Sequence, residues 1–428
     1  MTADPSPHEA EETLEPVALI EQSGVVIRTG LLMLASGTAS YRVKQAMAHV
    51  AVAVGLDRVS QNVSLTDIAV TSHRGRIFRT EVAENRAFAV NADRIVRLDR
   101  FRRTMPERMT PAEVHGELDA IERVPPVYPG WLNSLGAGIA CAAFAVLNHA
   151  LPWEVLVVAT AATVGQASRR ALGHRRFNTF GTTMVAAAIA SLLYLGGIAA
   201  LNATGEALLE THAAGFISSV LFLLPGFALI TGALDMAKLD MRAGIERIAF
   251  GTMLTVAAGV SVWAVSLLGT LNTLPRADSG WPIAATVALW AVASGVGVAG
   301  FAVMFNSPRR VVVIAGAIGA VANTVRLYAI ENGAAVQTAT ALACFAVGCL
   351  AAFVARGGRL PVITLSVPSV LVMIPGVAAH EALVDLNEGH YGAATAGILL
   401  VVLVVLAIMV GLVAAKLVSD REWAFGRT

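Results

Sequence analysis

The chain has 428 residues, of which 56% are hydrophobic and only 14% are charged. Soluble domains carry about 25% charged residues, so this composition excludes an ordinary soluble protein and indicates a chain largely embedded in lipid. The formal net charge of +1 gives no indication of a nucleic-acid partner, and none is predicted. Three cysteines lie within apolar runs, and neither a disulfide framework, a metal site nor a cofactor is predicted.

The N-terminal part of the chain has the patterning of a water-facing region. Residues 1–16 are acidic and contain proline, which is typical of a disordered tail and not of a secretory signal. Residues 17–130 predict a soluble α+β domain followed by a proline-rich linker. Its predicted elements are helices at Val17–Leu34 and Tyr41–Val54, strands around Val63–Val70, Arg76–Val82 and Arg94–Leu98, a hairpin turn at His73–Gly75, and a helix that starts at Thr110–Glu113.

The arginines and lysines of this domain suit either an anionic partner or a solvated face near the inner leaflet, and the second interpretation is favoured. The sequence has no phosphate-binding glycine loop, which disfavours an ATP-driven pump. It also has neither an H-E-x-x-H pattern nor a G-x-S-x-G elbow. We therefore predict that the protein is not an enzyme, although an integral-membrane enzyme is kept as the least favoured alternative.

From Trp131 onward, apolar runs alternate with short polar breaks. A helix needs about 20 apolar residues to cross the hydrocarbon core of a bilayer. The runs predict about ten transmembrane helices in two blocks of five, which occupy residues 131–278 and 279–428. The predicted spans are 132–148, 153–168, 178–201, 214–235 and 247–271 in the first block, and 282–305, 309–330, 334–355, 360–384 and 391–416 in the second.

The charged residues between these spans alternate strictly. One set of breaks, together with the C-terminal tail, holds fourteen basic residues, and the other set holds two, Arg276 and Arg326. Because basic residues stay on the cytoplasmic side, this asymmetry predicts a multi-pass protein of the plasma (inner) membrane with both termini in the cytoplasm. The fourteen are Arg169, Arg170, Arg175, Arg176, Lys238, Arg242, Arg247, Arg309, Arg310, Arg356, Arg359, Lys416, Arg421 and Arg427.

The two blocks share a pattern of landmarks. The fourth predicted span contains Pro225-Gly226 and the ninth contains Pro375-Gly376, 150 positions later, and Trp131 and Trp281 open the blocks at the same spacing. An odd number of spans per block gives the blocks opposite orientations. The pattern therefore predicts two inverted five-helix repeats, as in many secondary transporters.

The Pro-Gly pairs are the candidate substrate site. Proline lacks a backbone donor, and such a break persists in lipid only where protein or water satisfies the freed groups. Half-helices that start at Gly226 and Gly376 would present N–H groups suited to a carboxylate. The alternative is a pair of simple proline kinks. The candidate substrate-binding residues are Pro225, Gly226, Thr231, Asn323, Ser369, Pro375 and Gly376.

Intramembrane carboxylates are costly and often mark proton pathways. Asp235 and Asp385 each lie ten residues after a break proline, and Glu381 lies deeper in the ninth span. These three are the candidate proton-coupling residues, with Glu381 preferred; the alternative for the two aspartates is simple hydration at the interfaces. Arg326 either holds a substrate carboxylate or extends its side chain to the outer surface, and the second interpretation is favoured.

The sequence resembles the threonine/serine exporters. The resemblance rests on Gly37–Lys44, which reads GTASYRVK, on Leu65–Ile68, on Tyr128–Trp131 and on the two Pro-Gly spans. It covers nearly the whole chain after the tail. In many bacteria the two parts of this family reside on separate proteins, and some relatives are implicated in dicarboxylate export. The resemblance implies export of L-threonine and L-serine driven by the proton gradient.

The predicted function is therefore a secondary transporter that exports small hydroxy amino acids. Its predicted partners are an amino-acid substrate, protons and the lipid bilayer, and formation of a homo-oligomer is left open. A dicarboxylate exporter of the succinate type is the first alternative. A channel fits less well, because mid-membrane breaks in opposed repeats suit alternating access.

Overall fold

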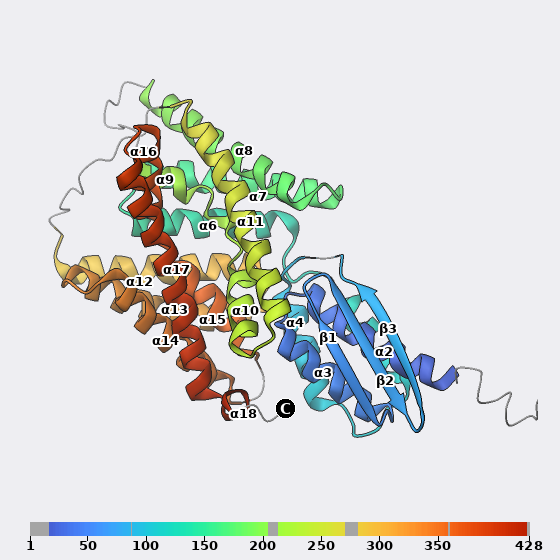
Figure 1. Cartoon of the computed structure of the whole chain (residues 1–428). Helices are drawn as coiled ribbons and strands as arrows, with labels where there is room; N and C mark the ends of the chain where they lie inside the picture. Colours follow the sequence, from blue (N-terminus) through green and yellow to red (C-terminus); the bar gives the residue numbers. More distant parts are fainter. Residues whose placement is uncertain (1–16, 87, 204–212, 270–280, 358–359, 426–428) are drawn as a thin grey trace, which may run out of the picture.

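The computed structural model describes residues 17–86, 88–203, 213–269, 281–357 and 360–425. The predicted tail at residues 1–16 lies outside these ranges, as do the loop residues Arg276, Arg359 and Arg427. An N-terminal α/β unit lies at one end of a much larger body of helices (Figure 1).

The N-terminal unit contains a three-stranded antiparallel sheet in the order β1-β2-β3, covered by helices. Its core joins apolar residues of α2, α3 and α5 to the buried face of β2. A small sheet with helices is the predicted α+β pattern. The elements are α2 (Val17–Ala35), α3 (Ser40–Ala53), β1 (Arg58–Val63), β2 (Asp67–Arg74), β3 (Ile77–Glu84), α4 (Ala92–Thr104) and α5 (Pro111–Glu122).

One strand prediction in this unit is wrong, and another is displaced along the chain. The predicted strand at Arg94–Leu98 is part of helix α4, because the Asn91 side chain caps the helix by accepting from the N–H of Arg94 at 3.1 Å. The predicted strand at Val63–Val70 overlaps β2 over its second half, but its first half crosses a turn, where the Ser64 hydroxyl accepts from the N–H of Asp67 at 2.9 Å. Strand β1 was missed because it is rich in polar residues.

Helix α2 is long and apolar enough to cross a membrane, but it packs against β2, β3, α3 and α5. Leu19, Val25 and Val26 are completely buried within the N-terminal unit. A Cβ atom on Gly30 would lie 2.9 Å from the side chain of Ile68 on β2. The apolar character of α2 is therefore explained by the core of the α/β unit.

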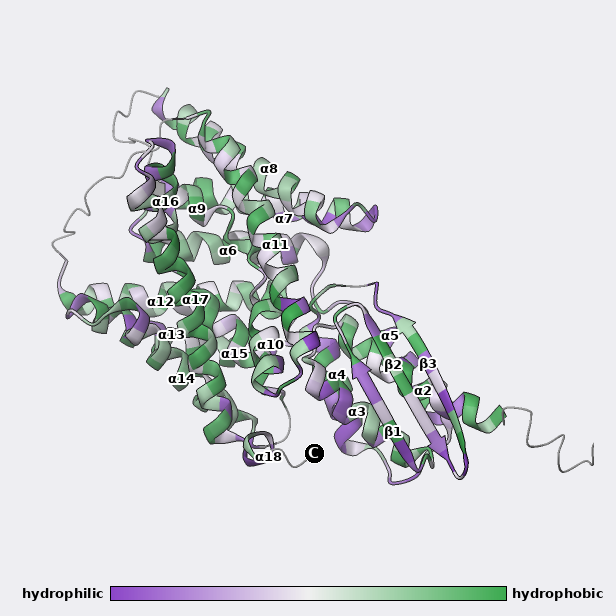
Figure 2. Cartoon of the chain, viewed as in Figure 1, coloured by the Kyte–Doolittle hydropathy of each residue, from purple (hydrophilic) through white to green (hydrophobic). Residues whose placement is uncertain are grey.

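The remaining helices form the apolar body. Figure 2 shows apolar residues along most of α8, α12 and α17, whereas polar residues gather on α3 and α4. The body contains α6 (Gly130–Leu147), α7 (Pro152–His174), α8 (Thr179–Asn202), α9 (Ala213–Ser218), the 3₁₀ turn η1 (Leu221–Leu223), α10 (Gly226–Ala237), α11 (Met241–Ser266), α12 (Ile283–Met304), α13 (Arg309–Glu331), α14 (Val336–Ala355), α15 (Val362–Leu371), α16 (Gly376–Asn387), α17 (Tyr391–Ser419) and α18 (Arg421–Ala424).

Within the described residues, eight helices are long and apolar enough to cross a bilayer, or up to ten if each of two bent pairs is one span. The eight include α2 and do not include α7, which carries Glu154, Arg169 and Arg170. Helix α7 has 23 residues and packs between α6 and α8, so its role as the second span stays a prediction.

The two predicted blocks have the same pattern of neighbours. In the first, α6 packs on α7, α7 on α8, α8 on α11, and α10 on α11. In the second, α12 packs on α13, α13 on α14, α14 on α17, and α16 on α17. The blocks meet along α6 and α12, where glycines allow a close approach of the two backbones. A Cβ on Gly300 would lie only 2.6 Å from the carbonyl oxygen of Gly136.

Replacing Gly300 with valine should therefore destabilise the contact between the blocks by about 1–3 kcal/mol, because backbone atoms cannot move aside easily. Thermal unfolding of the detergent-solubilised protein would measure the effect as a lower apparent Tm. Gly259→Val is the matched control, since no neighbouring atom lies within 4 Å of a Cβ at this exposed position of α11. Equal Tm values for the two variants would contradict the tight contact.

Candidate functional site

Two helices of the body are interrupted where the sequence has its Pro-Gly pairs. The segment Gly215–Leu223 meets α10 at an angle of 61°, and α15 meets α16 at 47°. Pro225 and Pro375 occupy the N-cap positions of α10 and α16, so Gly226 and Gly376 are the first residues of the second half-helices. The proline rings lack the donor that a continuous helix would need, and the breaks follow from this.

The interrupted helices lie against each other. Helix α10 packs on α15, and α9 packs on α16. A side chain on Gly226 would overlap that of Leu371, the last residue of α15. At the other break, a Cβ on Gly376 would lie 2.6 Å from the ring of Phe144 on α6. The four predicted break residues, Pro225, Gly226, Pro375 and Gly376, are therefore close-packed parts of one crossing of helices.

A chain of buried polar side chains lies next to the second break. The Asn323 amide donates to the Ser294 hydroxyl at 2.8 Å and accepts from Arg326 Nη1 at 3.2 Å. Arg326 Nε donates to Thr340 Oγ1 at 2.8 Å. One turn beyond Thr340, Cys344 Sγ lies 3.7 Å from Met373 Sδ in the break. Three helices thus direct polar groups to this region.

Arg326 is only 7% exposed. The favoured prediction, that its side chain reaches the outer surface, is therefore wrong. In the described part of the chain its hydrogen-bond partners are neutral oxygens. A buried guanidinium with neutral partners is costly, and an anion bound beside it would offset that cost.

The first break has a corresponding basic residue that the sequence analysis counted only as a loop charge. Arg169 Nη1 donates to the carbonyl oxygen of Phe222 at 3.4 Å, within the 3₁₀ turn η1. Arg169 and Arg326 each occupy the eighteenth position of their helices, α7 and α13. The same helix of each block therefore supplies a cation beside one of the two breaks.

The remaining two predicted substrate-binding residues, Ser369 and Thr231, use their hydroxyl groups in contacts between or within helices. Ser369 Oγ donates to the carbonyl oxygens of Leu365 and Ala315, which joins α15 to α13. Thr231 Oγ1 donates to the carbonyl of Phe227 at 2.6 Å and accepts from Arg247 Nη1 at 3.2 Å. Thr231 belongs to a second polar cluster, at the contact between α10 and the N-terminal unit.

This second cluster contains a buried ion pair. Asp235 is completely buried, and its Oδ2 lies 3.2 Å from Arg247 Nε. The carboxylate also accepts from the N–H of Ser40 at 3.1 Å and of Tyr41 at 3.4 Å, at the start of α3. Arg247 Nη2 donates to the carbonyl of Thr38 at 2.8 Å. The carboxylate therefore binds a helix N-terminus, which favours negative charge.

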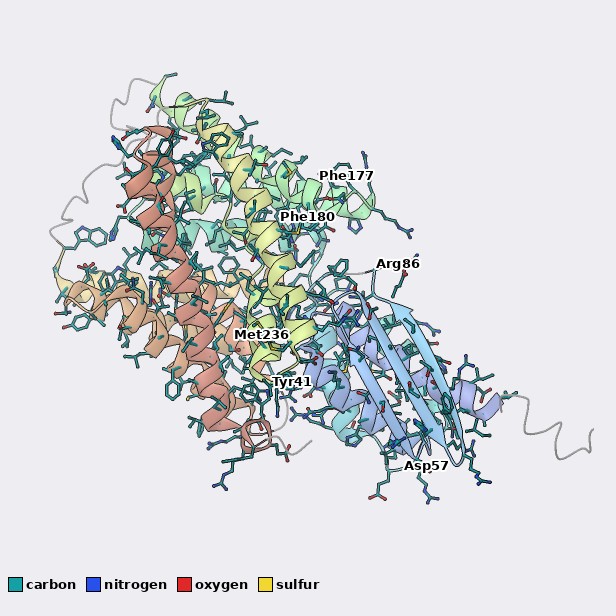
Figure 3. All side chains as sticks on the ribbon, viewed as in Figure 1. Tyr41, Asp57, Arg86, Phe177, Phe180 and Met236 are labelled. Atoms are coloured by element: carbon teal, nitrogen blue, oxygen red, sulfur yellow. The ribbon has the colours of Figure 1, made fainter. Side chains whose placement is uncertain are left out.

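Further contacts hold the same two parts together, and we call the whole set the docking contact. The Ser40 hydroxyl and the Lys44 ammonium both bind the carboxylate of Asp240, the latter at 2.7 Å. The N–H of Leu65 donates to Glu246 Oε2 at 2.8 Å. Figure 3 shows Tyr41 and Met236 close together where the N-terminal unit meets α10. The GTASYRVK and Leu65–Ile68 segments thus both contact the α10–α11 region.

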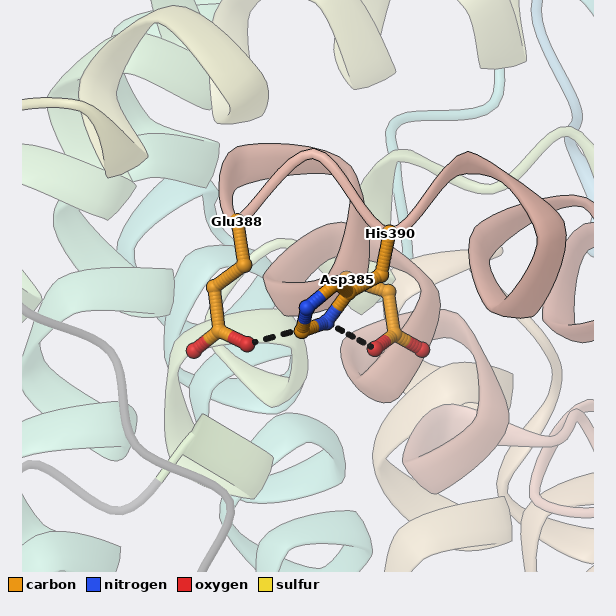
Figure 4. A group of neighbouring side chains, drawn as sticks. All are labelled: Asp385, Glu388 and His390. Atoms are coloured by element: carbon orange, nitrogen blue, oxygen red, sulfur yellow. Dashed lines mark ion pairs between the residues drawn. The ribbon is translucent and has the colours of Figure 1, made fainter.

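The structure does not bring the other predicted proton-coupling residues to these clusters. Glu381 lies on the exposed face of α16. Asp385 forms an ion pair with His390 at 3.6 Å, and Glu388 lies on the other side of that ring (Figure 4). Exposed acidic groups of this kind are common without a metal ion, and we assign no metal site to them.

One buried carboxylate was missed by the sequence analysis. Glu154 is completely buried near the start of α7. Its Oε1 accepts from the Tyr194 hydroxyl at 2.6 Å and from the N–H of Gly215 at 3.0 Å. Glu154 follows Pro152-Trp153 at the edge of an apolar run, which is also the position of an ordinary hydrated helix start, so no local pattern indicates its burial.

A body of apolar helices in which two are interrupted and cross defines the class: a multi-pass membrane protein of the transporter type. A model described as a threonine/serine exporter matches residues 24–269, and a second, described as "Threonine/Serine exporter, ThrE", matches residues 290–418. The chain belongs to the threonine/serine exporter family. No solved structure matches it.

Individual relatives are named either as threonine/serine exporters or as succinate transporter subunits. The chain is 26% identical over 391 residues to the "Threonine/serine exporter" of Corynebacterium glutamicum, which covers 86% of this chain and 78% of that protein. It is 28% identical over 238 residues to the "Probable succinate transporter subunit YjjP" of Klebsiella aerogenes, and 27% identical over 241 residues to the protein of that name in Escherichia coli. These two matches each cover 55% of this chain, and 89% and 90% of the relatives.

Proposed function

We propose that the protein is a secondary transporter that exports threonine and serine across the plasma membrane, driven by the proton gradient. Membership of the exporter family supports export, and the relative from Corynebacterium glutamicum supports this substrate class. The observation that carries the proposal is the crossing of the two interrupted helices. There, the N-termini of α10 and α16 and the buried Arg326 offer donors to a substrate carboxylate.

Export of dicarboxylates is the second candidate. A dicarboxylate carries two negative groups, and Arg169 and Arg326 place one cation beside each break. The YjjP relatives, which are named as probable succinate transporter subunits, support the same class. A zwitterionic amino acid needs an acceptor for its ammonium group as well, and neither break offers a buried carboxylate among the described hydrogen-bond partners.

The proton-coupling residues remain proposals. Asp235 is the best placed, because it joins α10 to the N-terminal unit, so a change in its charge would alter the docking contact. Glu381 and Asp385 both lie on α16, away from the docking contact. If Glu381 carries the proton, Glu381→Gln should impair proton-coupled export while the protein stays folded. Unchanged, gradient-dependent export by this variant would remove Glu381 from the mechanism.

The experiment that tests the function is efflux from vesicles that contain the purified full chain, loaded with radiolabelled threonine, serine or succinate. We expect saturable efflux that increases with the proton gradient and stops when an ionophore removes it. Efflux of threonine and serine but not succinate supports the first proposal, and the reverse supports the second. Flux that neither saturates nor responds to the gradient would contradict a secondary transporter.

We also propose that the blocks at residues 131–278 and 279–428 are inverted repeats, with the domain at 17–130 in the cytoplasm. Their matching neighbour patterns support this, as does the position of the break prolines. The basic residues at the start of α11 and at the ends of α14 and α17 lie on the side of the N-terminal unit, as cytoplasmic ends would.

Thiol labelling tests this orientation. In a variant without Cys141, Cys344 and Cys349, a cysteine at the exposed Leu239 should resist an impermeant reagent added outside the cell. A cysteine at Tyr391, which is 69% exposed near the start of α17, should react at once. Reaction of both positions from the same side would rule out the inverted arrangement.

A further inference from the structure

A basic cavity opens where the N-terminal unit meets the ends of α14 and α17. Its volume is about 260 Å³, and we call it the vestibule. This is slightly below the roughly 300–1,000 Å³ of pockets that hold drug-sized ligands, so it suits a small solute. Its charged lining consists of five cations and two carboxylates: Arg42, Arg103, Arg356, Lys416, Arg421, Asp420 and Glu422.

Several of these charges are paired. The Lys416 ammonium binds the Asp420 carboxylate. Arg103 Nη2 lies 2.6 Å from Asp99 Oδ2, and Arg42 Nη1 lies 3.8 Å from Asp99 Oδ1. Partial burial works against the ionisation of Asp420, but the hydrogen bonds from Lys416 and from the N–H of Trp423 hold its pKa below the usual value. Asp420 therefore stays charged and neutralises Lys416.

Two cations of the vestibule are not neutralised by a neighbouring carboxylate in the described part of the chain. Within the described residues, neither Arg356 nor Arg421 has an ion-pair partner, and Arg356 lies over the Phe353 ring at 5.7 Å. The vestibule thus has an excess of positive charge. Clustered cations in a cleft raise the local concentration of anions.

Membrane topology alone does not explain this cluster. Basic residues at the ends of α14 and α17 are expected on the cytoplasmic side. Arg42 and Arg103, however, come from α3 and α4 of the N-terminal unit, and they line the same cavity from the opposite wall. Two parts of the fold therefore contribute cations to one space.

The vestibule continues toward the interrupted helices. A smaller cavity of about 50 Å³ shares Arg42 and Lys416 with it. This second cavity reaches Ile230 on α10 and Ser366 on α15. Both helices are halves of the interrupted spans. The smaller cavity therefore lies between the vestibule and the helices that contain the breaks.

We propose that the vestibule is an access site that binds small dicarboxylate anions before they reach the breaks. The inference rests on the second candidate function, export of dicarboxylates, and deepens it by naming the site where these anions first bind. One ligand carboxylate would meet Arg356 and Arg421. The other would meet the wall that carries Arg42 and Arg103, two guanidinium groups that share the carboxylate of Asp99. The ammonium group of a threonine would meet the same positive charge and weaken its binding.

The test measures binding of succinate and of threonine to the full chain in nanodiscs of phosphatidylcholine, by calorimetry at low salt. We expect the double variant R356Q/R421Q to weaken succinate binding by at least tenfold, and added salt to weaken binding to the unaltered protein. In vesicles, the same variant should raise the KM for succinate efflux and leave kcat largely unchanged. The double variant R170Q/R175Q, which removes two cations outside the vestibule, is the matched control.

Three results would overturn the proposal. The first is equal succinate affinity for the vestibule variant and the control variant. The second is tighter binding of threonine than of succinate. The third is a vestibule variant that loses only its stabilisation by added phosphatidylglycerol, which would make the cavity a lipid-headgroup site. Intact succinate binding without efflux of any substrate would instead contradict the export function and leave the access site standing.

Discussion

Replacing Asp235 with alanine should abolish export and loosen the N-terminal unit from the helices. Arg247 would stay in a buried site without its carboxylate, and removal of one partner of a buried ion pair costs about 3–5 kcal/mol. The N–H groups of Ser40 and Tyr41 would lose their acceptor at the same time. Vesicle efflux and the rate of proteolysis in the linker after α5 would measure both effects.

Two further variants distinguish the effect of losing the docking contact on export from a general loss of folding. Asp240→Asn alters a neighbouring carboxylate that is more exposed, and we expect a smaller effect from it. The double variant D235L/R247M removes both buried charges and should recover folding, as apolar replacement of buried ion pairs often does. Full recovery of export by that variant would show that the pair has only a structural role. Export by Asp235→Ala at the unaltered rate would contradict the importance of the docking contact.

Replacing Arg326 with glutamine should weaken substrate binding strongly while the protein remains folded. The charged hydrogen bonds that a guanidinium offers to a carboxylate contribute about 1.5–3 kcal/mol. This corresponds to a loss of affinity on the order of 10- to 100-fold. Glutamine is able to keep neutral hydrogen bonds to Asn323 and Thr340, so the surrounding helices should stay in place. The KM for efflux from vesicles is the measurement.

The matched control for this prediction is Thr340→Val, which removes a partner of the guanidinium but leaves the charge. Arg326→Lys should have an intermediate effect, because lysine keeps the charge and loses the planar fork. The same series at Arg169 tests the first break. An unchanged KM for Arg326→Gln with every transported substrate would exclude the guanidinium from binding.

Much of the helical body was predictable because its signals are local. Apolar runs of membrane length predict spans, and a proline followed by glycine predicts a break at that residue. The breaks at Pro225 and Pro375 are therefore where the sequence places them. The strand predicted at Arg94–Leu98 failed because Ile95, Leu98 and Phe101 follow a helical spacing, with Asn91 as the cap.

The contacts around the candidate site were not predictable from one sequence. Asp235 and Ser40 are 195 positions apart, and nothing in the local pattern of either indicates that they pair. The burial of Arg326 depends on Ser294, Asn323 and Thr340, which come from three helices. Glu154 is buried because Tyr194 of α8 and Gly215 of α9 contact it at the start of α7. Such environments arise only when distant segments assemble.

The first turn of α3 binds the Asp235 carboxylate, so a movement of α10 would act on the N-terminal unit. If α10 tilts or slides as the transporter changes conformation, the first turn of α3 either moves with it or releases it. The position of the N-terminal unit would then depend on the conformation of the transporter. Thermodynamic linkage is reciprocal. A molecule that binds the N-terminal unit more tightly in one of its positions would therefore shift the equilibrium between transporter conformations by the difference in its binding free energies.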